Sequence, residues 1–261
     1  MKIFLDVARP QDHFTSLGSL LERYWSMYVT TGAHAVERAQ LLERIAHRMS
    51  EEEHLSVPLA IADDLPDALH GLLATGMLLK DERSLAFRHQ AFYEFTVARR
   101  FGSGRADLVS HVIERQDGLF VRPTILTTLV LLRETSPREY ERTISVLMTD
   151  STIRSHVKAL VTDFLGSQRE PLPVEINLLL PLLEDETLAP RVLTAVAGSP
   201  GWFVAMQSDV RFFRWFTDPA NAFRCLSLFT AAVEFDREAV LMLVTQHWIL
   251  GSTLNCDTDG N

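Results

Sequence analysis

Residues 85–101, LAFRHQAFYEFTVARRF, combine a short apolar strand with an amphipathic helix that follows it directly. Leu85 and Phe87 lie two positions apart, the spacing of side chains on one face of a strand. After His89 the apolar side chains recur at the spacing of one buried helix face, namely Phe92, Phe95, Val97 and Ala98. We therefore expect a strand that ends just before His89 and a helix that begins just after it.

Two helices and a short extended segment precede this stretch. Apolar residues three and four apart predict helices over residues 14–28 and 35–49. Pro58 disfavours helical geometry at Val57, so residues 57–59 are expected to be extended.

A capped helix and a hairpin follow. Asp64 is expected to cap a helix with Pro66 in its first turn, and Gly76 is expected to end it. Residues 77–79 and 85–87 flank a polar loop, which is the layout of a β-hairpin. Helix, helix, short strand, helix, hairpin and helix is the order of a winged helix. The sequence therefore predicts a helical linker and a winged-helix subdomain over residues 1–101.

The sequence after Gly102-Ser103-Gly104 predicts helices throughout. The expected helices are 105–116, 122–134, 137–149, 151–165, 173–184, 186–197, 202–206, 208–217, 221–233 and 236–248. Short connections between helices of about a dozen residues are typical of an α-helical solenoid of the HEAT or TPR kind. No fixed repeat length is visible, so residues 102–250 are interpreted as an irregular helical-repeat array. The polar residues 251–261 are expected to form a disordered tail. The predicted fold class is thus mainly α.

Composition excludes several classes of function. The 261 residues include 25 Lys and Arg against 34 Asp and Glu, a net charge of −9, whereas a nucleic-acid binder normally presents a basic face. Cys225 and Cys256 form neither a CxxC pair nor a Cys/His cluster, so the sequence indicates neither a disulfide framework nor a zinc site. A reducing cytoplasm fits this cysteine usage best.

Membrane and export signals are also missing from the sequence pattern. No segment reaches 18 apolar residues without a charge, so no membrane partner is expected. The first ten residues, MKIFLDVARP, are interrupted by Asp6 and Arg9 too early for a signal peptide.

No motif in the chain indicates catalysis. There is no GxxxxGK[ST] loop to hold a triphosphate, and neither a GxSxG nor an HExxH pattern occurs. His47 and His54 lie seven residues apart but lack a third candidate ligand, which disfavours a metal site. We therefore predict that the chain is not an enzyme and holds no cofactor or metal by itself.

Two further groups of side chains have structural explanations. Arg99 and Arg100 end the helix that follows His89, where arginines often satisfy terminal carbonyls. A set of aromatic residues could form a ligand-binding patch, but its helical spacing favours core packing. Its members are Trp202, Phe203, Phe212, Phe213, Trp215, Phe216 and Phe223.

The segment quoted at the start resembles a known family motif. Phe87, His89, Phe92, Glu94, Phe95, Ala98 and Arg99 match the pattern F-x-H-x-x-[FL]-x-[ED]-[FY]-x-x-A-R. This pattern closes the winged-helix subdomain of STAND NTPases, the NACHT-like signalling ATPases that include many bacterial antiviral sensors. In such proteins the ATP-hydrolysing core lies N-terminal to this segment.

Weaker similarities extend to both sides. MKIFLD resembles the end of the P-L-x-L-K-x-F-L-D helix that follows the ATPase core in such proteins, so we expect that the chain begins inside a longer protein or at an internal start codon. Residues 118–123, 163–166 and 197–203 are similar to turns in the helical region of bacterial members.

The resemblance assigns a role to His89. In NACHT-like relatives this histidine reaches the β-phosphate of bound ADP and holds the protein closed. Imidazole can donate a hydrogen bond to a phosphate oxygen, so the chemistry is reasonable. The alternative is a histidine that caps or packs at a strand-to-helix junction without a ligand. Glu94 and Arg99 are expected to support local structure.

Three classes of function follow from these observations. The leading one is the regulatory and sensor portion of a STAND-type ATPase that binds ATP or ADP elsewhere, with a helical array that binds a protein trigger and a parent that oligomerises. The second is a freestanding helical-repeat scaffold for protein–protein interaction. The third, a winged-helix DNA-binding regulator, is disfavoured because the 57–88 region is acidic. Its carboxylates are Asp63, Asp64, Asp67, Asp81 and Glu82.

Overall fold

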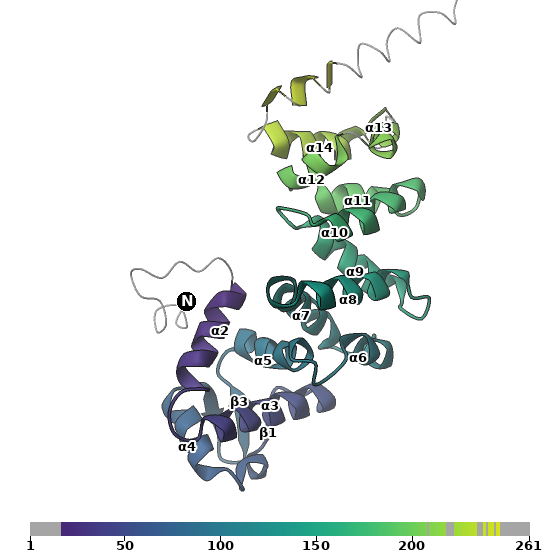
Figure 1. Ribbon diagram of the computed structural model, residues 1–261. Helices are drawn as coiled ribbons and strands as arrows, with labels where there is room; N and C mark the ends of the chain where they lie inside the picture. The colour runs from purple at the N-terminus through teal and green to yellow at the C-terminus, as the bar shows by residue number, and fades with distance from the viewer. Residues whose placement is uncertain are drawn as a thin grey trace, which may run out of the picture. The chain divides into compact units, whose positions relative to one another are not determined.

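The computed structural model describes residues 17–207, 209–217, 222–233, 237–238, 240–242 and 244–245. This part of the chain is mainly helical and includes a small three-stranded antiparallel sheet, which confirms the predicted fold class at this level (Figure 1). The chain divides into two compact units. Unit 1 contains the described residues up to Val146 together with Ser151–Ile153, and unit 2 contains Leu147–Asp150 and the described residues from Arg154 onward.

Unit 1 contains most of the helices that the sequence predicted before residue 149. Its elements are α2 (Leu17–Tyr28), α3 (Ala35–Glu52), β1 (Val57–Pro58), η1 (Leu59–Ala62), α4 (Pro66–Ala74), β2 (Leu78–Lys80), β3 (Ser84–Phe87), α5 (Gln90–Gly102), α6 (Leu108–Arg115) and α7 (Val121–Thr135). Helix α8 (Pro137–Thr149) continues from unit 1 across the division between the units.

The sheet of unit 1 has the strand order β1-β3-β2, with both pairs antiparallel. Leu78 pairs with Phe87 across the predicted hairpin, and Val57 pairs with Leu85. β1 is an edge strand, where Pro58 is tolerated because its missing N–H leaves no gap in a central ladder. Gly76, with φ of 70°, supplies the left-handed residue that ends α4 and turns the chain into β2.

The core of unit 1 lies where α2 and α3 pack against α5, and where α3 and α5 contact the sheet. It is strongly aromatic and aliphatic, with fully buried Trp25, Leu41, Leu42, Ile45, Leu72, Leu85, Phe92 and Phe95. The ring of Phe92 lies edge-on to Tyr24 with the two centroids 5.3 Å apart. Helix α5 also packs closely against α7, so the helix that follows His89 is held on two sides.

One predicted helix cap is wrong. Asp64 does not cap α4, whose N-cap residue is Leu65 without a side-chain hydrogen bond. The Asp64 carboxylate instead accepts hydrogen bonds from Arg44 of α3, with Oδ1 2.6 Å from Nη1. Asp64 therefore forms an ion pair with α3 instead of the helix cap that its position in the sequence predicted.

Unit 2 consists of short helices that pack in succession. They are α9 (Ser155–Gly166), α10 (Pro173–Leu179), η2 (Leu180–Glu184), α11 (Ala189–Val196), α12 (Pro200–Met206), α13 (Val210–Thr217) and α14 (Ala222–Val233). Helix α11 packs against α9 and α14, and α14 also packs against α12 and α13. Pro173 begins α10, as the predicted range 173–184 implied, and Pro200 begins α12 two residues before the predicted start at 202. Neither proline needs a backbone donor at this position.

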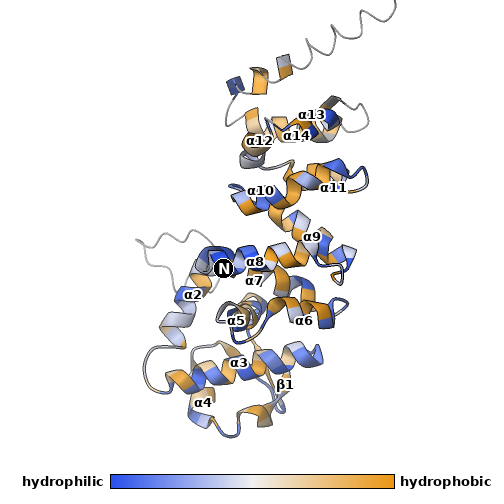
Figure 2. Cartoon of the chain, turned by 45° about the vertical axis from the view of Figure 1, so that its right-hand side comes forward, coloured by the Kyte–Doolittle hydropathy of each residue, from blue (hydrophilic) through white to orange (hydrophobic). Residues whose placement is uncertain are grey.

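Amphipathic patterning accounts for this packing. Figure 2 shows apolar and polar residues on different faces of many helices. In α11 the buried stripe is Ala189, Val192, Leu193 and Val196, which are three and four residues apart.

Some predictions fall outside the described residues. These are the helix end proposed for residues 1–5, the first residues of the 14–28 helix, and the disordered tail at 251–261. The predicted helix 236–248 is described only at residues 237–238, 240–242 and 244–245, which are helical.

Candidate functional site

His89 lies at the junction that the sequence predicted for it. It is the N-cap residue of α5, with an extended backbone (φ −126°, ψ 122°), and it directly follows Arg88 at the end of the hairpin. Its carbonyl accepts hydrogen bonds from the amides of Phe92, at 3.0 Å, and Tyr93, at 3.2 Å. Its imidazole is half-buried and makes no capping hydrogen bond to α5. The ring is therefore not engaged as a helix cap.

The other positions of the motif hold α5 in place. The apolar positions Phe92, Phe95 and Ala98 are at most 1% exposed, so they belong to the core. Glu94 accepts a hydrogen bond from the Gln90 amide at 2.8 Å, one turn earlier on the same helix. These residues fix the orientation of the helix that begins at His89.

Arg99 and Arg100 contact other helices, so the expectation that they satisfy the carbonyls at the end of α5 is wrong. The Arg99 guanidinium lies 4.5 Å from the centroid of the Trp25 ring and pairs with Glu22 of α2. The Arg100 guanidinium donates a hydrogen bond to Nδ1 of His47 on α3. Both arginines thus bridge α5 to neighbouring helices.

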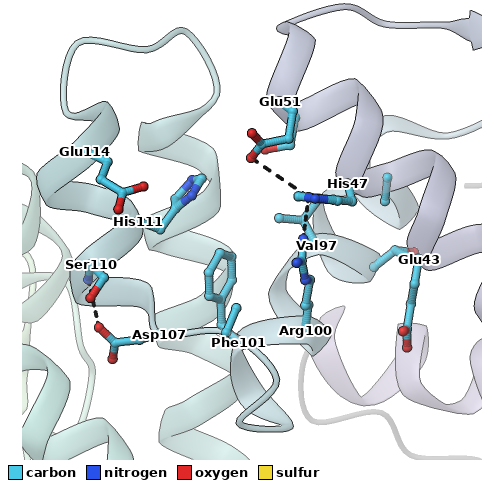
Figure 3. Close-up of a pocket in the computed structure, with 14 residues that line it drawn as sticks. Glu43, His47, Glu51, Val97, Arg100, Phe101, Asp107, Ser110, His111 and Glu114 are labelled. Atoms are coloured by element: carbon cyan, nitrogen blue, oxygen red, sulfur yellow. Dashed lines mark hydrogen bonds and ion pairs between the residues drawn. The ribbon is translucent and has the colours of Figure 1, made fainter.

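A cavity of about 200 Å³ lies between α3, α5 and α6, within unit 1 (Figure 3). Its lining combines two histidines with several charged side chains. These are Glu43, His47 and Glu51 of α3, Arg100 of α5, and Asp107, His111 and Glu114 at or in α6. Ser50 and Thr96, both buried, also line it.

Both histidines of the cavity are disfavoured as cations. Burial lowers the pKa of His47, and the nearby positive charge of Arg100 lowers it further. Burial also lowers the pKa of His111, with a further contribution from Arg115. The His111 ring lies against Phe101, with the ring centroids 5.2 Å apart.

His54, which the sequence analysis considered together with His47 before it disfavoured a metal site, is exposed and does not line the cavity. The structure instead brings His47 near His111, sixty-four positions later, and no local spacing connects the two helices. In the part of the chain that the structure describes, no three His, Cys, Asp or Glu side chains are grouped to hold a metal ion.

The aromatic set of unit 2 is a core cluster, as its spacing predicted, with one exception. Trp202, Phe203, Phe212, Trp215 and Phe216 are at most 6% exposed. Phe229 packs edge-on against Phe203, Phe212 and Phe216, with centroids 4.8–5.8 Å apart. Phe223, however, is 58% exposed, and the Phe213 side chain lies outside the described residues.

Among the described residues, no helix is both long and apolar enough to cross a bilayer. The chain matches no protein-family model, no curated protein and no solved structure.

Proposed function

We propose that this chain is the regulatory and sensor portion of a STAND-type signalling ATPase, and that it has no catalytic activity by itself. The observation that carries the proposal is the position of His89. The motif that ends in Ala98-Arg99 begins in β3, the third strand in sequence. The half-buried imidazole lies at the first turn of α5. A cytoplasmic location and a role in antiviral defence belong to the same proposal.

The arrangement around His89 supports a winged-helix subdomain. In sequence, β1 lies between α3 and α4, and the β2–β3 hairpin follows α4. In the sheet, β3 lies between β1 and β2. This is the order of elements that the sequence predicted for a winged helix. In the proposal, the subdomain packs on a nucleotide-binding core elsewhere in a longer parent protein.

The chemistry at His89 suits a phosphate sensor. The first amides of a helix and its dipole favour an anion at the N-terminus, which is where this imidazole lies. The ring can donate a hydrogen bond to the β-phosphate of ADP. A hydrogen bond to a charged group contributes about 1.5–3 kcal/mol. Losing it shifts the equilibrium between closed and open forms roughly ten- to a hundredfold.

The helices of unit 2 would bind the trigger or another protein partner. The succession of short packed helices from α9 to α14 supports an irregular HEAT- or TPR-like array. DNA binding by unit 1 is disfavoured, because all five carboxylates around α4 and the hairpin are exposed. These are Asp63, Asp64, Asp67, Asp81 and Glu82.

The test measures two properties of the same variant in the parent protein. The reading frame upstream of Met1 is first examined for an in-phase P-loop, which the proposal requires. His89→Ala should then accelerate ADP dissociation about tenfold to a hundredfold and leave the melting temperature nearly unchanged. His54→Ala, at an exposed histidine, serves as the control.

Two outcomes contradict this proposal. An unchanged ADP off-rate with a lower melting temperature would make His89 a packing residue. Absence of any in-phase P-loop would favour the second function, a freestanding helical-repeat scaffold. This chain alone should neither bind ATP tightly nor hydrolyse it, because it contains no P-loop.

A further inference from the structure

The cavity of unit 1 places a neutral histidine between a guanidinium and a carboxylate. Figure 3 shows His47 and Glu51 on one side, His111 and Glu114 on the other, and Arg100 and Phe101 of α5 between them. The groups come from three helices, so any change in their pairing changes how these helices are held together.

The hydrogen bond from Arg100 defines the protonation state of His47. A guanidinium has only donors, so Nδ1 of His47 must be the acceptor and cannot carry a proton. The neutral ring therefore carries its proton on Nε2. This contact can exist only while His47 is uncharged.

Glu51 connects α3 to α6 from the same place. Its Oε2 lies 2.5 Å from Nη2 of Arg115, and the Glu51 backbone carbonyl accepts a second hydrogen bond from Arg115 at 3.2 Å. Its Oε1 lies 3.9 Å from Nδ1 of His47. One carboxylate thus faces both an arginine of α6 and the imidazole nitrogen that Arg100 occupies.

We propose that His47, Arg100, Glu51 and Arg115 form a proton-dependent joint between α3 and α6. A proton taken from solvent onto Nδ1 of His47 ends the hydrogen bond from Arg100 and makes Nδ1 a donor. The imidazolium then pairs with Glu51, one helical turn away, and competes with Arg115 for this carboxylate. Arg100 is left facing a like charge, and the contact between α3 and α6 loosens. This inference does not depend on the proposed function.

His111 acts in the same direction. Its ring is packed against Phe101 and faces the positive charges of Arg115 and Arg100. Glu51 and Glu114 attract its charged form, but burial outweighs them, so its pKa is lowered overall. Protonation of His111 therefore also disfavours the packed arrangement of α6.

The remaining charged groups of the cavity do not reverse this direction. Glu43 is paired with Arg105. Asp107 accepts a hydrogen bond from the Ser110 amide at 2.8 Å and from Arg142 at 2.9 Å, and its pKa is lowered, so it stays ionised in mild acid. The titrating groups are the two imidazoles.

The pH window follows from the pKa directions. We call the form with α3 and α6 in contact packed, and the form in which this contact is lost open. In the packed form the pKa values of His47 and His111 are lowered, and in the open form they return toward the usual value near 6.5. The open form therefore binds more protons below about pH 6.5, and the packed form loses stability as the pH falls. Above that pH the joint is fully closed.

The test is hydrogen exchange of the whole chain at pH 7.5 and pH 5.5, corrected for intrinsic exchange. Protection of residues 108–115 in α6 should fall by up to about tenfold in acid for each of the two histidines, because pH 5.5 lies about one unit below their usual pKa. Protection of residues 155–166 in α9 is the internal reference. In His47→Asn the side-chain oxygen can replace Nδ1 as the acceptor for Arg100, but it cannot be protonated. The double variant His47→Asn, His111→Gln should therefore show no acid-induced loss of protection in α6. His54→Asn should behave as the unmodified chain does.

Two results would overturn the joint. One is an equal loss of α6 protection in the double variant and the unmodified chain, or no loss in either. The other comes from the ¹⁵N chemical shifts of His47 in the unmodified chain, which report which ring nitrogen carries the proton. This measurement tests the proposal even if the double variant does not fold. The proposal requires His47 to carry its proton on Nε2 at pH 7.5 and to titrate below pH 6.5, so a proton on Nδ1 contradicts it.

Discussion

The guanidinium of Arg99 covers the indole ring of Trp25 at 4.5 Å from the ring centroid while it pairs with Glu22, one helical turn before Trp25. A single side chain of α5 thus makes a cation–π contact and an ion pair with the same helix, α2. Phe95 also lies beneath the guanidinium, at 5.7 Å. The contacts of Arg99 with Trp25 and Glu22 join α5, the helix that begins after His89, to α2.

Replacing Arg99 should therefore weaken unit 1. Arg99→Ala should lower the free energy of unfolding by about 1–2 kcal/mol, since a partly buried cation–π contact contributes ~0.5–2 kcal/mol and a partly exposed ion pair less than ~1 kcal/mol. Urea denaturation followed by tryptophan fluorescence measures this loss. Arg48→Ala, which removes an exposed pair with Glu52 on one helix, should cost less than about 0.5 kcal/mol. Equal losses in both variants would show that the Trp25 contact contributes nothing.

Tyr93 gives unit 1 a sensitivity to alkaline pH. Burial on α5 raises its pKa to about 12. Because the folded state holds this proton more tightly than the unfolded state, the contribution of Tyr93 to stability should be constant below pH 10 and decrease as the pH rises from 10 toward 12. The ultraviolet absorbance of tyrosinate measures the ionisation. Tyr93→Phe should remove a step near pH 12, and a titration curve that keeps this step would assign it to another tyrosine.

The elements that could be predicted from the sequence are those specified by local patterns. The β2–β3 hairpin follows from apolar runs on either side of a polar loop, and the pairing of Leu78 with Phe87 confirms it. Pro173 marks the start of α10, because the N–H that proline lacks has no partner in the first turn of a helix. Both signals act within a few residues and need no tertiary contact.

The parts that could not be predicted depend on contacts between distant segments. Asp64 has the residue type of a cap, but Arg44 lies within reach only after α3 and α4 pack. His47 and His111 share a cavity because α3, α5 and α6 converge. The sequence pattern of α3 does not indicate that α6 packs beside it, and that of α6 does not indicate α3. Their meeting can be found only from the fold.

Phe223 shows the limit of helical periodicity. The buried stripe of α14 is Cys225, Leu228, Phe229 and Ala232, with spacings of three, one and three residues. Phe223 does not lie on this stripe, so it faces outward although it is aromatic and close to the cluster in sequence. The spacing of the aromatic residues alone does not distinguish the two faces of α14.

Trp202 should be a strong contributor to the stability of unit 2. It is fully buried, and its Nε1 donates a hydrogen bond to the Leu165 carbonyl at 3.1 Å, which ties α12 to α9. Trp202→Phe should cost about 1–3 kcal/mol, from the lost hydrogen bond and the cavity left by the smaller ring. Val204→Ala on the same helix, at an exposed position, should change stability by less than about 0.5 kcal/mol. Thermal unfolding compares the two, and a similar shift in both variants would contradict the assigned role of the indole.

Gly166 allows a close approach of α9 and α11 in unit 2. A Cβ atom at this position would lie 2.5 Å from Cβ of Ala195 and 2.7 Å from its carbonyl carbon, so α9 and α11 could not stay at their present separation. In an open helix, Gly→Ala would stabilise by up to about 1 kcal/mol through helix propensity. The overpacking at Ala195 should outweigh this gain, and we expect Gly166→Ala to destabilise unit 2 by about 1–3 kcal/mol.

Gly198 offers the matched control for this substitution. A Cβ atom there meets nothing within 4 Å, and its backbone is not in the left-handed region. Gly198→Ala should therefore be neutral or stabilise by about 0.4–1 kcal/mol, because it reduces the conformational freedom of the unfolded chain. Hydrogen exchange of α9 and α11 in both variants locates the effect. If Gly166→Ala left protection of α11 unchanged, the close contact between Gly166 and Ala195 would not limit the packing of these helices. Loss of protection in α11 with Gly166→Ala but not with Gly198→Ala would assign the cost to that contact.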